Sequence, residues 1–233
     1  MRLLEVEHKF AWTPAKLKLL HLGMGQPPLK KLTDIKIETL RDTYYDKNNK
    51  LSNTGLWLRK RKHIASPHHK LPLQGAPMPG AISWQAKQGK KHSSYLRSTF
   101  EETEDMNQIL GMVRAHFPKS PGHEENFGLD VVADFETSRH TFLANDYFTI
   151  VLDDSDFDHQ VGEVELLARL EDVDKAHAEI DNFVKEYSWF FDTTNPKGKL
   201  TAYFEKFGYP KETPSKDEDH DNLSSYRCDQ ICG

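Results

Sequence analysis

Charged and apolar residues alternate along many short segments of this chain, and this alternation restricts its fold more than any other feature. In Glu5-Val6-Glu7-His8-Lys9, two acids and one base share one face, because successive side chains of a strand point to opposite faces. Glu163-Val164-Glu165 repeats the pattern late in the chain. Taken alone, such a segment is also typical of an edge strand with a solvated face. Several charged strands together favour a closed barrel, which can gather charged faces around one wet interior, whereas a sandwich would expose them.

The rest of the chain supplies enough strands for a barrel and enough amphipathic helices to cover it. Helices are expected at about residues 13–22, 103–116, 173–189 and 195–208, with Thr13, Thr103 and Asn195 at their starts. Strands are expected at about residues 5–9, 38–46, 55–63, 81–88, 93–102, 129–142, 146–153 and 159–170. We therefore expect an α+β fold, an eight-stranded closed barrel with covering helices, as one domain over residues 1–210.

Two segments do not fit the barrel pattern. Residues 64–80 contain four prolines, which interrupt strand pairing, so we expect a surface loop there. Residues 211–233 are polar and mixed in charge, and we expect a disordered tail. The only cysteines, Cys228 and Cys232, lie in this tail, so the fold does not depend on a disulfide framework.

Composition and charge exclude several classes of partner. Lys and Arg number 31 against 36 Asp and Glu, for a net charge of −5, which argues against a surface built to hold nucleic acid. No run of about 18 apolar residues suggests a membrane span. The first residues reach Glu5 too early for a signal peptide. We expect a cytoplasmic monomer that binds neither nucleic acid nor a membrane.

The charged positions predict what the barrel interior binds. Buried cations are costly without an anion to neutralise them, and grouped carboxylates are costly without a metal. Lys199 begins the last helix, where a cation opposes the helix dipole, and this placement hints that it points at an anion. The predicted interior residues are Glu5, Glu7, Lys9, Arg41, Arg59, Arg61, Lys87, Arg97, Glu101, Arg139, Asp153, Glu163, Glu165 and Lys199.

Residues 5–9 match an ExExK pattern. Through this motif and those given below, the chain resembles the CYTH superfamily, also called triphosphate tunnel metalloenzymes. It is most similar to the thiamine triphosphatase branch. The supporting motifs are Arg41-Asp42-Thr43-Tyr44-Tyr45-Asp46, Trp57-Leu58-Arg59-Lys60-Arg61, Trp84-Gln85-Ala86-Lys87, Arg139 after Phe135-Glu136-Thr137-Ser138, Val161-Gly162-Glu163-Val164-Glu165, and Lys199-Leu200. The resemblance covers about residues 3–207. It implies an antiparallel eight-stranded tunnel that hydrolyses the terminal phosphate of a small triphosphate with the help of Mg²⁺ or Mn²⁺.

The resemblance also implies roles for individual residues. Glu5, Glu7, Lys9, Asp153 and Glu165 are the implied catalytic residues. The implied metal ligands are Glu5, Glu7, Asp153, Glu163 and Glu165. The implied phosphate-binding residues are Lys9, Arg41, Arg59, Arg61, Lys87, Arg139 and Lys199.

Two residues bear on substrate and metal. Trp57 shares a strand face with Arg59, so it could stack on a thiamine ring or pack in the tunnel wall. Val151 stands where the resembling proteins have the first of two alternating aspartates, which weakens the case for a second metal site.

Three functions remain open from the sequence. The first is hydrolysis of thiamine triphosphate to thiamine diphosphate and phosphate. The second is hydrolysis of inorganic tripolyphosphate, because phosphates alone satisfy the implied basic residues. The third is a catalytically silent polyphosphate-binding module, favoured by Val151 and by the long loop 64–80.

Overall fold

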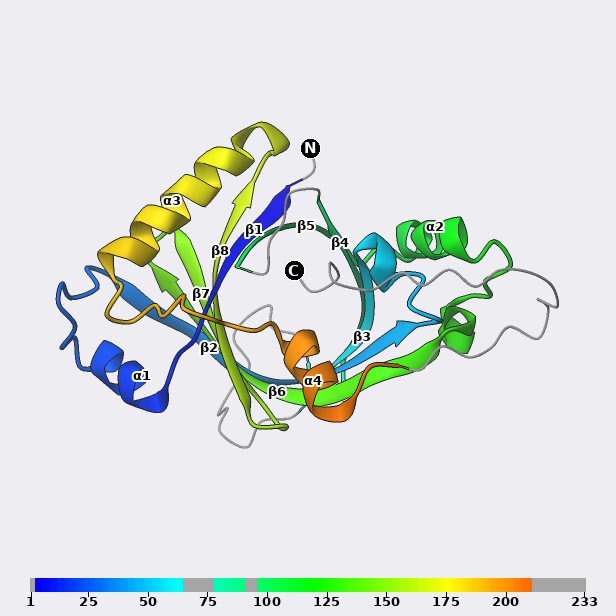
Figure 1. The fold of residues 1–233 in the computed structure, drawn as a ribbon, viewed down its shortest axis with the longest axis horizontal. Helices are drawn as coiled ribbons and strands as arrows, with labels where there is room; N and C mark the ends of the chain where they lie inside the picture. The colour runs from blue at the N-terminus through cyan, green and yellow to red at the C-terminus, as the bar shows by residue number, and fades with distance from the viewer. Residues whose placement is uncertain (1–2, 65–77, 91–95, 211–233) are drawn as a thin grey trace, which may run out of the picture.

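Eight strands close into one antiparallel barrel in the computed structural model, which describes residues 3–64, 78–90 and 96–210. Around the ring the strand order is β1-β5-β4-β3-β2-β6-β7-β8, and β8 pairs back to β1. Figure 1 shows the strands as a ring, so the predicted closed barrel is confirmed. The strands are β1 (Leu4–Phe10), β2 (Leu32–Asp46), β3 (Leu56–Ile64), β4 (Ile82–Gly89), β5 (Arg97–Thr103), β6 (Asp130–Ala144), β7 (Phe148–Ser155) and β8 (His159–Ala168).

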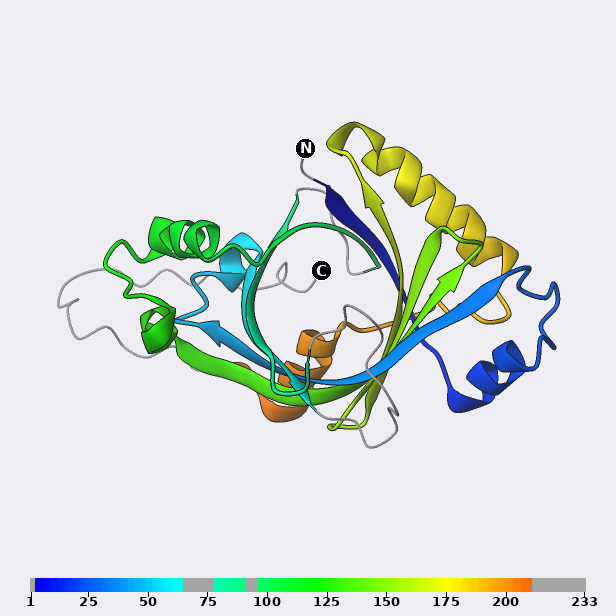
Figure 2. The same ribbon diagram turned by 180° about the vertical axis from the view of Figure 1, so that it is seen from behind.

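The first three α-helices lie outside the ring of strands, whereas the last overlies its edge (Figures 1 and 2). On one side, α1 (Pro14–His21) and α3 (Val173–Glu186) flank the wall that contains β1, β7 and β8, and α2 (Met106–His116) lies on the other side near β3 and β4. The last helix, α4 (Lys199–Phe207), contacts β6 and β8. Three short 3-10 helices join these elements: η1 (Ser52–Thr54), η2 (His123–Gly128) and η3 (Leu170–Asp172).

Most of the apolar core lies between the outer face of the barrel and the helices. One cluster fills the space under α1 and α3, and a second lies under α2, both outside the barrel. A third packs α4 on inward-facing residues that include Tyr44 and Phe135. Full burial of one large apolar side chain contributes about 1.5–3 kcal/mol. This arrangement leaves much of the barrel interior free for polar side chains. Central members of the three clusters are Phe142, Ile150 and Phe183; Trp84, Ile109 and Val113; and Phe135, Phe157 and Phe204.

Helix starts follow capping chemistry, with two differences from the prediction. Thr13 caps α1 as expected, because its hydroxyl accepts a hydrogen bond from the Lys16 backbone N–H at 3.3 Å. Asp105, not Thr103, caps α2, since its carboxylate accepts from the Gln108 N–H at 2.8 Å. The last helix begins at Lys199 rather than near residue 195, with the extended residue Gly198 at its N-cap.

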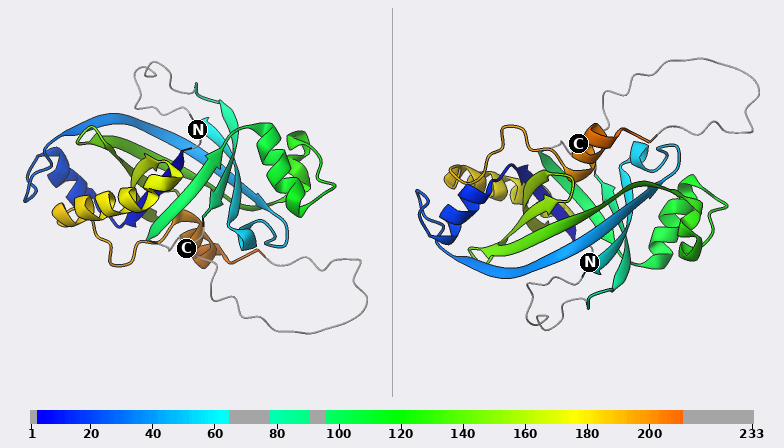
Figure 3. Two further views of the ribbon diagram at one scale, coloured as in Figure 1. Left: turned by 90° about the horizontal axis from the view of Figure 1, so that it is seen from above. Right: turned by 90° about the horizontal axis from the view of Figure 1, so that it is seen from below.

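The second strand is longer than predicted. It begins at Leu32 rather than near residue 38, and its first half pairs with the end of β6. Figure 3 shows these two long strands running together along one side of the molecule. A register shift between Asp34 and Lys36 interrupts the two-residue alternation, and that alternation is the signal by which a strand is recognised.

Parts of the predicted organisation fall outside the described residues. The proposed tail, 211–233, and residues 65–77 of the proposed loop belong to this group. Among the residues that are described, every helix is too short or too polar to cross a membrane.

Candidate active site

A cavity of about 220 Å³ is lined by residues from α4 and from every strand of the ring except β7. Side chains of both charges meet there, as the alternation in the sequence predicted. The sequence-predicted residues that line it are Glu5, Glu7, Lys9, Trp57, Arg59, Arg61, Lys87, Arg139, Glu163, Glu165 and Lys199.

Carboxylates gather on the wall formed by β1 and β8. Glu7 stands opposite Glu165 in the β1–β8 register, and Lys9 stands opposite Glu163. Carboxylate oxygens of Glu5, Glu7 and Glu165 all lie within 4.8 Å of one another. Burial, reinforced by the negative charges of Glu5 and Glu163, raises the pKa of Glu165 well above its ordinary value. The wall therefore holds acids that repel one another.

Two lysines offset part of this negative charge. The Lys87 ammonium donates to Glu5 at 2.6 Å and to Glu7 at 2.9 Å, and the Lys9 ammonium also donates to Glu7. Burial alone would lower the pKa of Lys87, but the carboxylates of Glu5 and Glu7 outweigh it and raise that pKa well above its ordinary value. Both lysines are therefore charged and lie next to the acid cluster.

Guanidinium groups occupy the wall formed by β2 and β3. Asp42 stands opposite Arg61 in the register, and the Arg61 guanidinium donates two hydrogen bonds to its carboxylate, at 2.7 and 2.6 Å. Arg59 donates to the side chains of Gln85 at 2.7 Å and Tyr44 at 3.3 Å. Burial would raise the pKa of Asp42, but the charges of Arg59 and Arg61 hold it well below its ordinary value. Asp42 thereby fixes both arginines toward the cavity.

Asp153 holds cations and does not join the carboxylate cluster. It lies opposite Arg139 across β6 and β7, and the guanidinium donates to both carboxylate oxygens at 2.7 Å. The Lys199 ammonium donates to the same carboxylate. Burial would raise the pKa of Asp153, but Arg139 and Lys199 outweigh it and lower that pKa. Asp153 is thus brought into contact with two predicted phosphate-binding residues, and not with the other predicted metal ligands.

The predicted interior facing of Arg41, Arg97 and Glu101 is wrong. The guanidinium of Arg41 lies outside the cavity and donates to Asp134 at 3.1 and 2.6 Å. Arg97 pairs with Asp181 of α3, and Glu101 accepts from Lys90. The cause is that the alternate residues of β2 and β5 face inward. A strand shifted by one residue turns every side chain to the other face. The inward residues are Tyr44, Phe100 and Glu102, with Asp42 buried beside them.

Sequence reasoning missed two acids that orient the basic residues. Glu102 lies 3.5 Å from the Lys87 nitrogen and 3.9 Å from an Arg59 nitrogen. Burial would raise the pKa of Glu102, but Lys87 and Arg59 outweigh it and lower that pKa. Asp42 and Glu102 each follow a charged residue directly in the sequence, so alternation alone could not say which of the two neighbours faces inward. By contrast, the sequence does identify Gln85 as an inward residue, because it lies two positions before Lys87 on the same strand face.

The donor set of the acid cluster fits a hard divalent cation. Every donor from Glu5, Glu7, Glu163 and Glu165 is a carboxylate oxygen, which Mg²⁺ and Mn²⁺ prefer to nitrogen or sulfur donors. Such a cation would relieve the repulsion by Glu5 and Glu163 that adds to burial in raising the pKa of Glu165. The opposite wall carries arginines suited to phosphate oxygens, because a planar guanidinium can donate two parallel hydrogen bonds.

Solved structures with the same architecture support this description of the fold. The PH1819 protein from Pyrococcus horikoshii OT3 is 17% identical, with a TM-score of 0.58, over 87% of this chain and 99% of that one. The putative adenylyl cyclase HpAC1 from Hippeastrum, described as having a dominant triphosphatase activity, is 13% identical with a TM-score of 0.53, over 93% and 100%. A putative adenylate cyclase from Vibrio parahaemolyticus is 14% identical with a TM-score of 0.52, over 85% and 95%.

The match to a protein family rests on sequence rather than on shape. No match was found among curated proteins. The model of the CYTH domain matches residues 3–194, a span that runs from β1 to the segment before α4 and contains both walls of the cavity. This chain belongs to the CYTH domain family.

Proposed function

We propose that this protein hydrolyses the terminal phosphate of a small triphosphate, with thiamine triphosphate as substrate and Mg²⁺ or Mn²⁺ as cofactor. The observation that carries the proposal is one cavity with a carboxylate cluster on one wall and fixed guanidinium groups on the other. A triphosphate–metal complex carries the complementary charges. The Hippeastrum protein of the same fold, described as a triphosphatase, adds support.

The basic residues would bind and orient the phosphates. Arg59, Arg61 and Arg139 present mostly buried guanidinium groups that Asp42 and Asp153 hold in place. Phosphoryl transfer needs little covalent chemistry from a protein, so positioning and charge stabilisation supply most of the rate. Asp153 would position Arg139 and Lys199. Arg41 would not bind phosphate, because it points away from the cavity.

The metal would lie at the acid cluster. Glu5, Glu7 and Glu165 would hold it, with Glu163 next to them. When bound, a divalent cation neutralises phosphate charge and polarises the phosphoryl group. Lys9 and Lys87 contact the same carboxylates, so both lysines stand where phosphate oxygens would meet the cluster.

Thiamine specificity rests on the aromatic part of the lining. Trp57 lies opposite Lys87 in the β3–β4 register, and Tyr44 and Phe100 also line the cavity. A flat ring on these side chains would gain stacking contacts. Inorganic tripolyphosphate is the second candidate, favoured because the charged residues of the lining need only phosphates to satisfy them.

The test compares two substrates on chelator-treated protein. Phosphate release is measured from thiamine triphosphate and from tripolyphosphate, before and after addition of Mg²⁺ or Mn²⁺. We expect turnover of both only with metal, and a higher kcat/KM for thiamine triphosphate. Trp57→Ala should raise KM for thiamine triphosphate and leave tripolyphosphate hydrolysis nearly unchanged, because only the first substrate has a ring.

Each alternative predicts a different result in the same assay. A higher kcat/KM for tripolyphosphate, with equal effects of Trp57→Ala on both substrates, would assign the inorganic substrate instead. Binding of both compounds without phosphate release at any metal concentration would contradict an enzyme and leave a polyphosphate-binding module. Glu163→Gln, which removes a charge from the cluster at nearly constant volume, should abolish the metal-dependent rate.

A further inference from the structure

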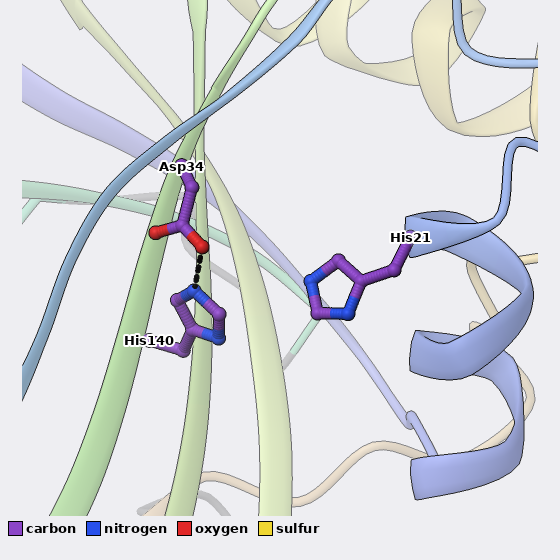
Figure 4. Close-up of side chains that lie close together, drawn as sticks. All are labelled: His21, Asp34 and His140. Carbon is purple, nitrogen blue, oxygen red and sulfur yellow. Dashed lines mark hydrogen bonds and ion pairs between the residues drawn. The ribbon is translucent and has the colours of Figure 1, made fainter. Parts of the chain in front are cut away.

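A second group of metal-ligand side chains lies on the outer face of the barrel. His21 ends α1, Asp34 lies near the start of β2, and His140 lies in β6. One potential ligand atom from each lies within 4.8 Å of the other two. Figure 4 shows the two strand residues joined by a hydrogen bond and the His21 ring directed toward them from the helix. Residues from three separate elements thus converge on one point.

The strand pairing explains why two of these residues share a face. Asp34 stands opposite Phe142, so the two side chains point to the same side of the sheet. His140 precedes Phe142 by two positions and therefore also points to that side. Arg139, the residue before His140, lines the cavity on the other side. The outer group is consequently separated from the active site by the barrel wall.

Local packing holds the two imidazoles near each other. Phe142 is almost completely buried, and its ring centroid lies 3.9 Å from that of His140 and 5.7 Å from that of His21. The helix is anchored by buried Leu20 and by the Lys16 ammonium, which donates to the Phe190 carbonyl at 3.3 Å. His21 and Asp34 are exposed, so a cation can reach them from solvent.

The chemistry of the donors selects the class of cation. Two imidazole nitrogens and one carboxylate oxygen suit Zn²⁺, whereas Mg²⁺ prefers oxygen donors alone. Zinc bonds of about 2.0–2.2 Å in a tetrahedral site place ligand atoms about 3.3–3.6 Å apart. The three ligand atoms lie within 4.8 Å of one another, so small side-chain movements of the exposed His21 and Asp34 would reach that geometry. Three protein ligands would leave a fourth position for water.

We propose that His21, Asp34 and His140 form a zinc site on the outer face of the barrel, distinct from the carboxylate cluster inside it. The bound cation would tie the end of α1 to β2 and β6. Zinc would then stabilise the folded protein, because a ligand that binds only the native state raises its stability.

The test titrates Zn²⁺ into the chelator-treated full chain against a chromophoric zinc chelator, with excess Mg²⁺ present to occupy the carboxylate cluster. We compare the wild type with His21→Gln and Asp34→Asn, both at exposed positions where folding is least affected. Loss of an outer-shell partner alone weakens metal binding by about 10- to 100-fold. Loss of a direct ligand should therefore weaken zinc binding by more than about tenfold. The wild type should retain one zinc equivalent that both variants lose.

Two control variants test whether the effect is specific. His123→Gln removes a half-exposed histidine of η2, and Asp146→Asn removes an aspartate as exposed as Asp34, with 60% against 58% of the side chain accessible. Both controls should bind zinc like the wild type. Zinc should also raise the melting temperature of the wild type more than that of His21→Gln. Equal zinc binding by the wild type, His21→Gln and Asp34→Asn would overturn the proposal.

Discussion

At the scale of single residues, two arginine–aspartate pairs, each with one member on β2, have similar geometry and different burial. Arg61 donates two short hydrogen bonds to Asp42, whose side chain is 1% exposed. Arg41 donates two to Asp134, whose side chain is 32% exposed while that of Arg41 is 51% exposed. Removing one partner of a buried pair costs about 3–5 kcal/mol, whereas an exposed pair contributes about 0–1 kcal/mol. Burial, not geometry, should therefore decide how much each pair contributes to the free energy of unfolding.

Asp42→Asn should lower the free energy of unfolding at pH 7 by about 3–5 kcal/mol, because Arg61 loses the charge that offsets its burial. Arg59 and Arg61 hold the pKa of Asp42 below its ordinary 3.8 despite burial, so this contribution is present above pH 3.8. The contribution is lost as the pH falls below 3.8 toward the lower pKa that Asp42 has in the folded protein. Urea unfolding at pH 7 and at pH 3 measures both effects. A similar loss in Asp134→Asn would refute the difference attributed to burial.

At the scale of elements, the sequence predicts which strands exist better than which way they face. In β1 and β8, acids alternate with Val6 and Val164, so one face is unambiguously charged. In β2, Arg41 and Asp42 are adjacent, and each could have been the inward residue. The decision comes from tertiary packing, because Tyr45, which shares a face with Arg41, packs on Trp84 in the cluster under α2. Such long-range contacts are not readable from a local pattern.

The same limit applies to the first half of β2. Its register shift breaks the alternation, and for that reason Asp34 was not recognised as a neighbour of His140. A helix capping residue, by contrast, acts through a contact three positions away. The cap at Thr13 was therefore predictable. The cap predicted for α2, Thr103, lies only two positions before the observed cap, Asp105.

Strand β7 offers a test of the acid cluster. Val151 is buried and stands opposite Glu163, on the inward face where an extra carboxylate would meet the cluster. Val151→Asp should lower the melting temperature in chelator, because it adds a like charge at a buried position. Mg²⁺ or Mn²⁺ should restore more of the melting temperature in this variant than in the wild type. Val151→Asn serves as the uncharged control, and a metal response equal to that of Val151→Asp would contradict a metal at the cluster.

At the scale of the whole molecule, the fold separates apolar packing from charge. Helices cover the outer face of the barrel and bury two of the three apolar clusters there, so most of the inner face can carry acids and bases. A bound metal–polyanion complex would offset the cost of burying those charges. A ligand bound only to the native state adds RT ln(1 + [L]/Kd) to stability, about 2.7 kcal/mol at a hundredfold excess over Kd. In a domain of this size, 1 kcal/mol raises the melting temperature by about 2–4 °C.

The most direct measurement is therefore the shift in melting temperature that tripolyphosphate produces without metal in the wild type, Arg59→Gln and Lys60→Gln. Arg59 lines the cavity, whereas its neighbour Lys60 lies over the Trp84 ring of the outer cluster, 5.7 Å from the ring centroid. Both substitutions remove one positive charge from the same strand. We predict a rise of several degrees in the wild type and in Lys60→Gln, and a much smaller rise in Arg59→Gln. Equal shifts in the two variants, or none in the wild type, would contradict a polyanion-binding interior.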